Sequence, residues 1–289
     1  MVEVNKTLLV KLRRETLAPF SACSEALISS NNNYEEAKKA LFSKSILKAK
    51  SNLSSENALP EGRVLSINSE DYTVGVMFSL RAQTDFVTNS AGFQQTQCTI
   101  GETLLNYVKT NDINTLSISE AQLIRDSRDN LTLEDKILSL SAITKEKIQL
   151  AELWISPRGR DNITLSYQHH NSKLGVLLTL KKNNPSTTID YAELKKLALH
   201  YAAADSTFLT EDQVTTAWVN AEKQKLRENL LSKNPNIPNL DSIVEKQIRK
   251  IISDQTFSSQ MFILDSSIAI STLLSKYDLT PIWAAKLSL

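Results

Sequence analysis

The pattern of hydrophobic and polar positions divides the chain into a helical amino-terminal part and a longer part in which strands and helices alternate. Over the first fifty residues, apolar side chains recur at helical spacing. They predict three short helices, of which the first ends near Thr16, the second covers Cys23–Leu27 and the third spans Tyr34–Leu47. The sequence therefore predicts a compact three-helix bundle over residues 1–50.

A polar stretch without periodicity separates this bundle from the rest of the chain. Residues 51–61 are rich in Ser and Asn, as is typical of a linker. Beyond it, two β-rich runs at Arg63–Asn68 and Thr73–Leu80 flank a short polar segment and predict a hairpin. Helical patterns follow over Gly101–Val108 and Leu131–Leu153.

One short sequence occurs twice. The run Gly75-Val76-Met77-Phe78-Ser79-Leu80 recurs as Gly175-Val176-Leu177-Leu178-Thr179-Leu180. Each copy is the second run of a predicted hairpin and is followed by a helix, and the later copy pairs with Ile163–His169. The repetition predicts an α+β fold with two related lobes in tandem, built from antiparallel strands and packed helices, at residues 62–158 and 159–289.

The second lobe also contains further predicted elements. Two pairs of residues, Asn234-Pro235 and Ile237-Pro238, break the helical pattern between its second and third helices. The predicted elements are helices at Tyr191–Ala203, Glu211–Leu231 and Leu240–Ile252, a short strand near Met261–Leu264, a helix at Ser267–Leu274 and a last strand near Ile282–Leu287.

Composition narrows the classes of protein. The 289 residues include 33 basic and 32 acidic side chains, and the formal net charge is +1. A dedicated nucleic-acid binder would need a clear basic excess, so no direct nucleic-acid partner is expected. No apolar run is long enough to cross a bilayer, and no secretory signal is visible, so we expect neither a membrane partner nor export. The two cysteines, Cys23 and Cys98, do not predict a disulfide scaffold or a zinc site.

A search for catalytic motifs finds no phosphate-binding loop, no dinucleotide-binding fingerprint and no nucleophile elbow. The three histidines are His169, His170 and His200, and they lie on a predicted strand and a predicted helix without an obvious set of carboxylate ligands. The sequence therefore predicts no enzyme activity, no cofactor and no metal.

One cluster stands out at the end of the second strand. Thr84-Asp85-Phe86-Val87 puts an acid and a large aromatic side by side where the strand gives way to a loop or a helix. In a purely structural interpretation, Asp85 caps the next helix while Phe86 and Phe93 pack into the lobe.

Several separated segments together resemble one family, elongation factor Ts, the guanine-nucleotide exchange factor of elongation factor Tu. The segments occur in the family's order along nearly the whole chain. They are Lys11–Thr16 followed by Ala18, Phe20, Cys23, Ala26 and Leu27; Thr84–Val87 with Phe93; Tyr167-Gln168-His169; Leu174–Leu177; and Leu199–Ala203, with weaker similarity at Glu146, Ile148, Glu211–Val214 and Gln260–Phe262.

The chain also departs from the family pattern. The family has Gly where Leu17 stands, Asp at Ala22 and Asn-x-Glu at Arg81-Ala82-Gln83, and its Gly-Glu-Asn is here Lys145-Glu146-Lys147. Such divergence, with the internal repeat kept, suggests an organellar member. The resemblance therefore predicts the mitochondrial matrix, with the bacterial cytoplasm as the alternative.

The resemblance implies a protein that binds elongation factor Tu, in its nucleotide-free and GDP-bound forms, and promotes GDP release during translation elongation. Asp85, Phe86 and Val87 would form a wedge near the Mg²⁺ and phosphate site of the partner. The other contacts that it implies are Leu12, Arg13 and Phe20 in the bundle and His169 at the second hairpin. Each of three residues also has a simple structural role: Leu12 in the core of the bundle, Arg13 on a solvated helix face, and His169 in a hydrogen bond inside the lobe.

A second hypothesis treats the chain as an interaction adaptor, because UBA-like three-helix bundles of this size also occur as modules that bind ubiquitin or similar proteins. An unrecognised hydrolase is a third possibility, but no motif favours it.

Overall fold

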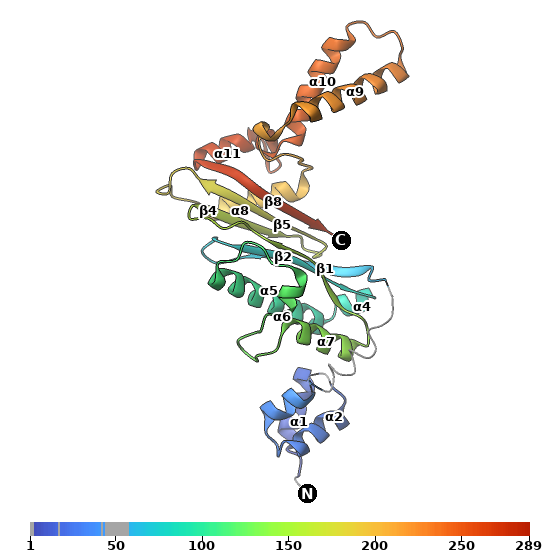
Figure 1. The fold of residues 1–289 in the computed structure, drawn as a ribbon, viewed down its shortest axis with the longest axis vertical. Helices are drawn as coiled ribbons and strands as arrows, with labels where there is room; N and C mark the ends of the chain where they lie inside the picture. The colour runs from blue at the N-terminus through green and yellow to red at the C-terminus, as the bar shows by residue number, and fades with distance from the viewer. Residues whose placement is uncertain (1–2, 17, 42, 44–57) are drawn as a thin grey trace.

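The protein is seen here in a computed structural model that describes residues 3–16, 18–41, 43 and 58–289 (Figure 1). A helical bundle lies at one end, two sheets lie in the middle, and a helical hairpin projects at the other end. This mixture of helices and antiparallel sheets confirms the predicted α+β class.

The amino-terminal part contains the predicted helices. They are α1 (Lys6–Thr16), α2 (Phe20–Ser29) and a third helical stretch at residues 34–41 and 43. The apolar stripes of these helices meet in a small core that includes Leu12, Cys23 and Leu27, all fully buried. The rest of the third predicted helix and residues 51–57 of the predicted linker lie outside the described residues.

Lobe 1, as we call residues 61–158, is one antiparallel sheet with helices on one face. Strand β2 lies between β1 and β3, and the side chains of Phe78, Phe93 and Leu104 fill the space between sheet and helices. Its elements are β1 (Glu61–Asn68), β2 (Gly75–Ala82), α4 (Asp85–Thr88), α5 (Ala91–Asn111), α6 (Ile118–Leu123), α7 (Leu133–Thr144) and β3 (Gln149–Ile155).

The predicted helix at Leu131–Leu153 is wrong in its second half. Helix α7 ends at Thr144 because Lys145 takes a left-handed conformation with φ 60°. The chain then turns back as β3, where Leu150 and Leu153 pair with β2. Pairing with a buried central strand prevails over the helical spacing of the leucines.

Lobe 2, residues 159–289, repeats the sheet with the order β4-β5-β8. The helix predicted at Tyr191–Ala203 has these bounds in the structure. The helix predicted at Ser267–Leu274 is wrong at its start, because residues up to Ala269 pair as a strand and the helix begins at Ile270. The elements are β4 (Asn162–Gln168), β5 (Leu174–Lys182), α8 (Tyr191–Ala203), η1 (Glu211–Gln213), α9 (Thr216–Lys233), α10 (Leu240–Gln255), η2 (Phe257–Ser259), β6 (Met261–Phe262), β7 (Asp265–Ala269), α11 (Ile270–Lys276) and β8 (Leu279–Ser288).

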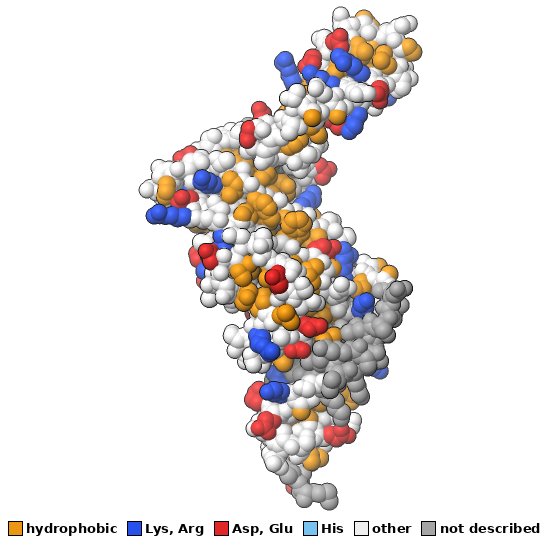
Figure 2. All heavy atoms as spheres, in the orientation of Figure 1, with side chains coloured by type: hydrophobic (Ala, Val, Ile, Leu, Met, Phe, Trp, Pro, Cys, Tyr) orange, Lys and Arg blue, Asp and Glu red, His pale blue; other side chains and the backbone are white. Residues whose placement is uncertain are grey.

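Helices α9 and α10 form the projecting hairpin. Ion pairs cross between them, including one from Arg227 to Asp241 and one from Lys223 to Glu245. Figure 2 shows charged side chains of both signs scattered over this hairpin. It is therefore a largely solvated extension of lobe 2 and contributes little to the core of that lobe.

The repeated sequence explains how the two sheets meet. On β2 and β5, alternate residues face the helices of their own lobe, while Met77 and Leu177 face the other sheet in a shared cluster with Val64. The two glycines of the repeat permit this close packing. A Cβ built on Gly75 would lie 2.7 Å from Thr164 Cγ2, and one built on Gly175 would lie 2.6 Å from Val64 Cγ1.

The contacts between the lobes are reciprocal. The Thr164 N–H donates to the Tyr72 carbonyl and the Val64 N–H donates to the Ser172 carbonyl, each at 2.7 Å. Both carbonyl residues have left-handed backbones. Each partner in one bond is 100 residues from its counterpart in the other, so the lobes are related by an approximate two-fold axis.

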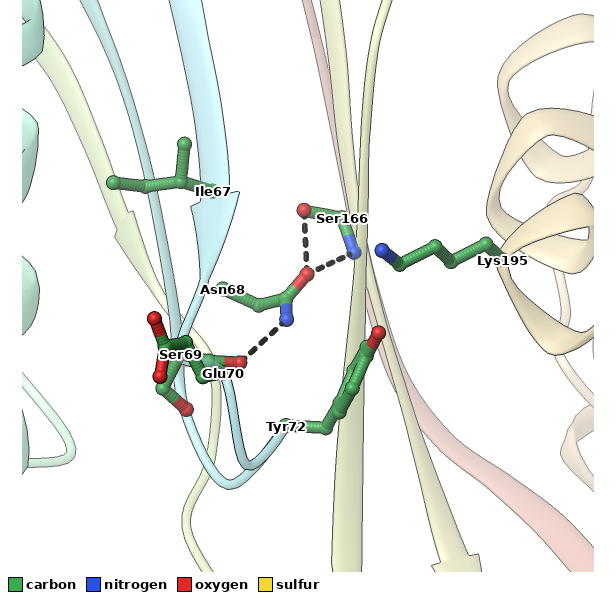
Figure 3. A pocket seen from close by; sticks show the side chains of 7 residues that line it. All are labelled: Ile67, Asn68, Ser69, Glu70, Tyr72, Ser166 and Lys195. Carbon is green, nitrogen blue, oxygen red and sulfur yellow. Dashed lines mark hydrogen bonds between the residues drawn. The ribbon is translucent and has the colours of Figure 1, made fainter. Parts of the chain in front are cut away.

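Side chains continue this reciprocity. Asn68 Oδ1 accepts a hydrogen bond from the Ser166 N–H at 3.1 Å, and Gln168 Oε1 accepts one from the Ser66 N–H at 3.3 Å. Figure 3 shows the Asn68 junction, where a hollow of about 410 Å³ opens between Lys195 of α8 and the first hairpin turn. The lobes are therefore joined at both ends of the strand pair β1–β4.

Candidate partner-binding site

Helix α4 is a single turn that presents an acid and an aromatic ring to solvent. Thr84 is its N-cap, with its hydroxyl accepting from the Val87 N–H at 3.4 Å. Val87 and Thr88 are buried against lobe 1, whereas Asp85 is exposed and Phe86 is 85% exposed. One side of the turn thus anchors it, and the other side carries Asp85 and Phe86.

The purely structural interpretation of this segment is wrong at two positions. Asp85 does not cap the helix, since Thr84 holds that position, and Phe86 does not pack into the lobe. Phe93 does pack there and is fully buried. A scattered exposed leucine is common on protein surfaces, but a phenylalanine this exposed on a firmly anchored turn is typical of a partner contact.

Arg63 connects this turn to the second hairpin. Its guanidinium donates to Asn89 Oδ1, at the C-cap of α4, at 3.4 Å and to Ser172 Oγ at 2.8 Å. Its carbonyl accepts from Gln97 Nε2 of α5 at 2.8 Å. Arg63 was not predicted as a site residue, because the sequence gives no sign that a strand residue joins two segments so far apart.

His169 lies at the start of the turn that Arg63 reaches. Its Nδ1 is 2.8 Å from the Tyr167 hydroxyl, and its half-buried ring lies 4.2 Å from the ring of His170. The backbone of the turn is fixed by a hydrogen bond from the Ser172 N–H to the His169 carbonyl. Arg63 thus links the C-cap of α4 to the turn that begins at His169.

The three bundle residues have different environments. Leu12 is fully buried in the bundle core, so its side chain supports the bundle and does not form its surface. Arg13 is exposed, with its guanidinium 5.4 Å from the centroid of the Phe20 ring, and Phe20 is 50% exposed. Arg13 and Phe20 therefore form one exposed pair.

The described part of the chain contains no group of three or more His, Cys, Asp or Glu residues that could hold a metal ion. His200 is buried in lobe 2, far along the chain from His169, and its Nε2 lies 3.0 Å from Gln260 Oε1. Among the described helices, none is both long and apolar enough to span a membrane.

Comparisons with known proteins point to one family. The family model described as elongation factor TS matches residues 83–286. Proteins named elongation factor Ts are 27% identical over 267 residues in Phytoplasma australiense, 28% over 277 residues in Spiroplasma citri and 28% over 270 residues in Borreliella burgdorferi. These alignments cover 91%, 94% and 92% of this chain and 90%, 88% and 89% of the relatives.

A rigid two-lobed body with an exposed acid–aromatic turn is suited to binding another protein, and the matches place this body among translation elongation factors. The chain belongs to the elongation factor Ts family. The resemblance predicted from five separate segments is thereby confirmed.

Proposed function

We propose that this chain carries out guanine-nucleotide exchange on elongation factor Tu by inserting α4 near the Mg²⁺ and phosphate site of that partner. The exchange-factor role follows from membership of the family. The observation that supports the wedge is the exposure of Phe86 beside Asp85 on a turn whose other side is buried.

Exchange follows from linkage. If the chain binds nucleotide-free elongation factor Tu more tightly than the GDP-bound form, the affinity of the partner for GDP must fall by the same factor when the chain is bound. No bond is made or broken, so the chain acts as a binding protein and not as a catalyst of a chemical reaction. Both nucleotide states of the partner take part in the cycle, with the nucleotide-free state bound more tightly.

Asp85 and Phe86 would act on different parts of the partner. A carboxylate brought near Mg²⁺ and phosphates repels the negative charge of the nucleotide or disturbs the surroundings of the ion. A phenyl ring inserts into apolar space and keeps the displaced segment of the partner apart. Both side chains need a fixed base, which the buried Val87 and the strand β2 supply.

The wedge is tested by Phe86→Ala and Asp85→Ala. Because neither side chain is packed in the free protein, we expect the release of labelled GDP, measured by stopped flow, to slow about tenfold or more, while the melting temperature stays within about a degree. Leu123→Ala is the matched control, since Leu123 of α6 is 67% exposed but lies outside α4. Unchanged release in both α4 variants would show that α4 is not the wedge.

Further contacts belong to the same proposal. Arg13 and Phe20 would extend the contact from the bundle, with Leu12 supporting them from the core, and His169 would extend it from the second hairpin. We expect His169→Ala to weaken binding to elongation factor Tu several-fold, with His170→Ala as the neighbouring control. Equal effects of the two substitutions would argue against a specific role for His169. The comparisons give no support to the ubiquitin-binding adaptor.

The mitochondrial matrix is the compartment that we propose, with the bacterial cytoplasm as the alternative. Divergence from the family pattern at Ala22 and Lys145 supports it, although the relatives named above are bacterial. Fractionation of source cells, with immunodetection of the native protein, tests it: recovery outside mitochondria would overturn the proposal.

A further inference from the structure

The carboxylate of Glu146 grips the residue that caps the wedge turn. Its Oε2 accepts from the Thr84 N–H at 3.0 Å, and its Oε1 accepts from the Thr84 hydroxyl at 2.6 Å. A carboxylate that receives two hydrogen bonds from one residue fixes both the backbone and the side-chain rotamer of that residue. Glu146 lies in the turn between α7 and β3, 62 residues further along the chain than Thr84.

The fold delivers Glu146 to this position through an unusual turn. Lys145, with φ 60°, ends α7 in a left-handed conformation, and the Thr144 hydroxyl accepts from the Glu146 N–H at 3.4 Å. The next N–H, of Lys147, donates to Gln83 Oε1 at 3.3 Å. The ladder between β2 and β3 reaches Arg81 opposite Gln149, so these side-chain bonds continue the connection of the two strands beyond the ladder.

Helix α4 depends on the two hydrogen bonds between Thr84 and Glu146 more than a longer helix would. Helix α4 has four residues, and a helix of one turn has almost no stability of its own. Phe86 receives no support from packing, because it is 85% exposed. Since the Thr84 hydroxyl gives its proton to Glu146, a lone pair remains free to accept from the Val87 N–H, which closes the turn.

We propose that Glu146 is a positioning residue for nucleotide exchange: by clamping Thr84 it sets the direction in which Asp85 and Phe86 leave lobe 1. This inference rests on the proposed function, because it requires α4 to be the wedge. Glu146 itself faces Thr84 and need not touch the partner. Loss of the Glu146 carboxylate should therefore slow the release of GDP. It should have little effect on the binding of the chain to elongation factor Tu, because other contacts support that binding.

Glu146→Gln is the first test. The amide oxygen can still accept from the Thr84 N–H, but the NH₂ group that replaces the other oxygen cannot accept from the Thr84 hydroxyl, so the charge-assisted bond that holds this hydroxyl is lost. We expect the maximal rate of GDP release at saturating exchange factor to fall about tenfold, while the concentration for half-maximal effect changes less than about twofold. Glu146→Asp shortens the side chain and should lower the maximal rate of GDP release to a similar extent. Thr84→Val removes the hydroxyl but keeps the shape of the Thr84 side chain.

Glu152→Gln is the matched control. Glu152 lies on β3, six residues after Glu146, and its carboxylate binds the Ser79 hydroxyl and Arg81 instead of Thr84. Its substitution should lower the melting temperature by about as much as Glu146→Gln and leave the maximal rate unchanged. Amide hydrogen exchange of residues 84–89 in the free protein provides a readout without the partner, and it should accelerate in Glu146→Gln and not in Glu152→Gln.

A double-mutant cycle with Phe86→Ala separates the two proposals. If Glu146 acts through the wedge, Glu146→Gln should cause little further slowing in the Phe86→Ala background. Normal exchange in both Phe86→Ala and Asp85→Ala would overturn the wedge itself. Slow exchange in Phe86→Ala together with a normal maximal rate in Glu146→Gln, or fully additive losses, would overturn the positioning role alone.

Discussion

In lobe 1 the central strand β2 ends at Ala82 and helix α4 begins at Asp85. In lobe 2 the equivalent strand β5 ends at Lys182, and residues 183–190 connect it to α8 without a counterpart of α4. The sheets themselves correspond strand for strand, and the bonds between them are reciprocal. The lobes therefore agree where they touch each other and differ where they face outward.

This difference separates two kinds of constraint. Residues between the sheets are fixed by the packing of one lobe on the other, so the repeat keeps Gly75 with Gly175. Segments that leave the sheets meet no such partner and are free to differ. Lobe 1 has gained α4 with its exposed ring, and lobe 2 has gained the α9–α10 hairpin between α8 and its third strand.

The largest effect on stability should come from filling the space at the repeated glycines. In Gly75→Ala and Gly175→Ala, the new methyl group would meet Thr164 and Val64, whose β-branched side chains cannot swing aside within a strand. We expect each substitution to lower the free energy of unfolding by about 1–3 kcal/mol, measured by urea denaturation. Gly159→Ala is the control, because the nearest atoms there belong to the side chain of Asn162, which can turn aside at the cost of one hydrogen bond to the Pro157 carbonyl. If Gly175→Ala were as stable as the control, the sheets would be less tightly packed than the structure shows.

A smaller effect should distinguish the two reciprocal amides. Asn68 Oδ1 accepts from both the N–H and the hydroxyl of Ser166, at 3.1 Å and 2.6 Å, whereas Gln168 accepts a single longer bond from Ser66. We expect Asn68→Ala to cost about 1–2 kcal/mol of unfolding free energy and Gln168→Ala about 1 kcal/mol or less. Gln224→Ala on exposed α9 serves as the reference for loss of an amide. The reverse order would mean that the number and length of the accepted hydrogen bonds do not decide the strength of these junctions.

The sequence predicts the repeated part of the fold well, because two β-rich runs around a polar turn can form few structures other than a hairpin. The prediction from sequence is wrong at β3. The leucines of Leu131–Leu153 suit a helix, and the left-handed end of α7 falls on a lysine instead of the usual glycine. Only the pairing of Leu150 with Leu80 across the sheet decides the outcome, and pairing between distant segments leaves no local pattern.

The candidate site also has a part that the sequence predicts and a part that it does not. The run Thr84–Val87 is visible in the sequence, but the outward direction of Phe86 depends on how α4 lies on lobe 1. The contacts of Arg63 and Glu146 join segments separated along the chain and could not be predicted. The residues that we propose to touch a partner can thus be found by their resemblance to a family, whereas the contacts that position them require the structure.

The smallest predicted effect concerns one position at which the lobes differ inside their cores. Ile100 of α5 and His200 of α8 are 100 residues apart, and both are buried. Burial lowers the pKa of His200 below its usual value of 6.5, and the hydrogen bond with Gln260 opposes this shift in part. Since Nδ1 of this histidine accepts from the Ile263 N–H at 3.1 Å, the neutral ring is the form that fits.

The sign of the pH dependence follows. Between the lowered pKa of folded His200 and 6.5, the unfolded chain binds more protons, so stability is complete above about pH 6.5 and falls as the pH drops toward the folded-state value. In His200→Leu this component disappears, although the variant is less stable at pH 7.5 because Gln260 and the Ile263 N–H lose their partner. The gap in unfolding free energy between the two proteins should therefore narrow from pH 7.5 to pH 5.5. His169 and His170 are common to both proteins and cancel in this comparison. If the difference in unfolding free energy stayed constant, His200 would titrate alike in the folded and unfolded chains. Amide hydrogen exchange at low pH should become faster in α8, and faster exchange in α5 as well would mean that the acid sensitivity is not confined to lobe 2.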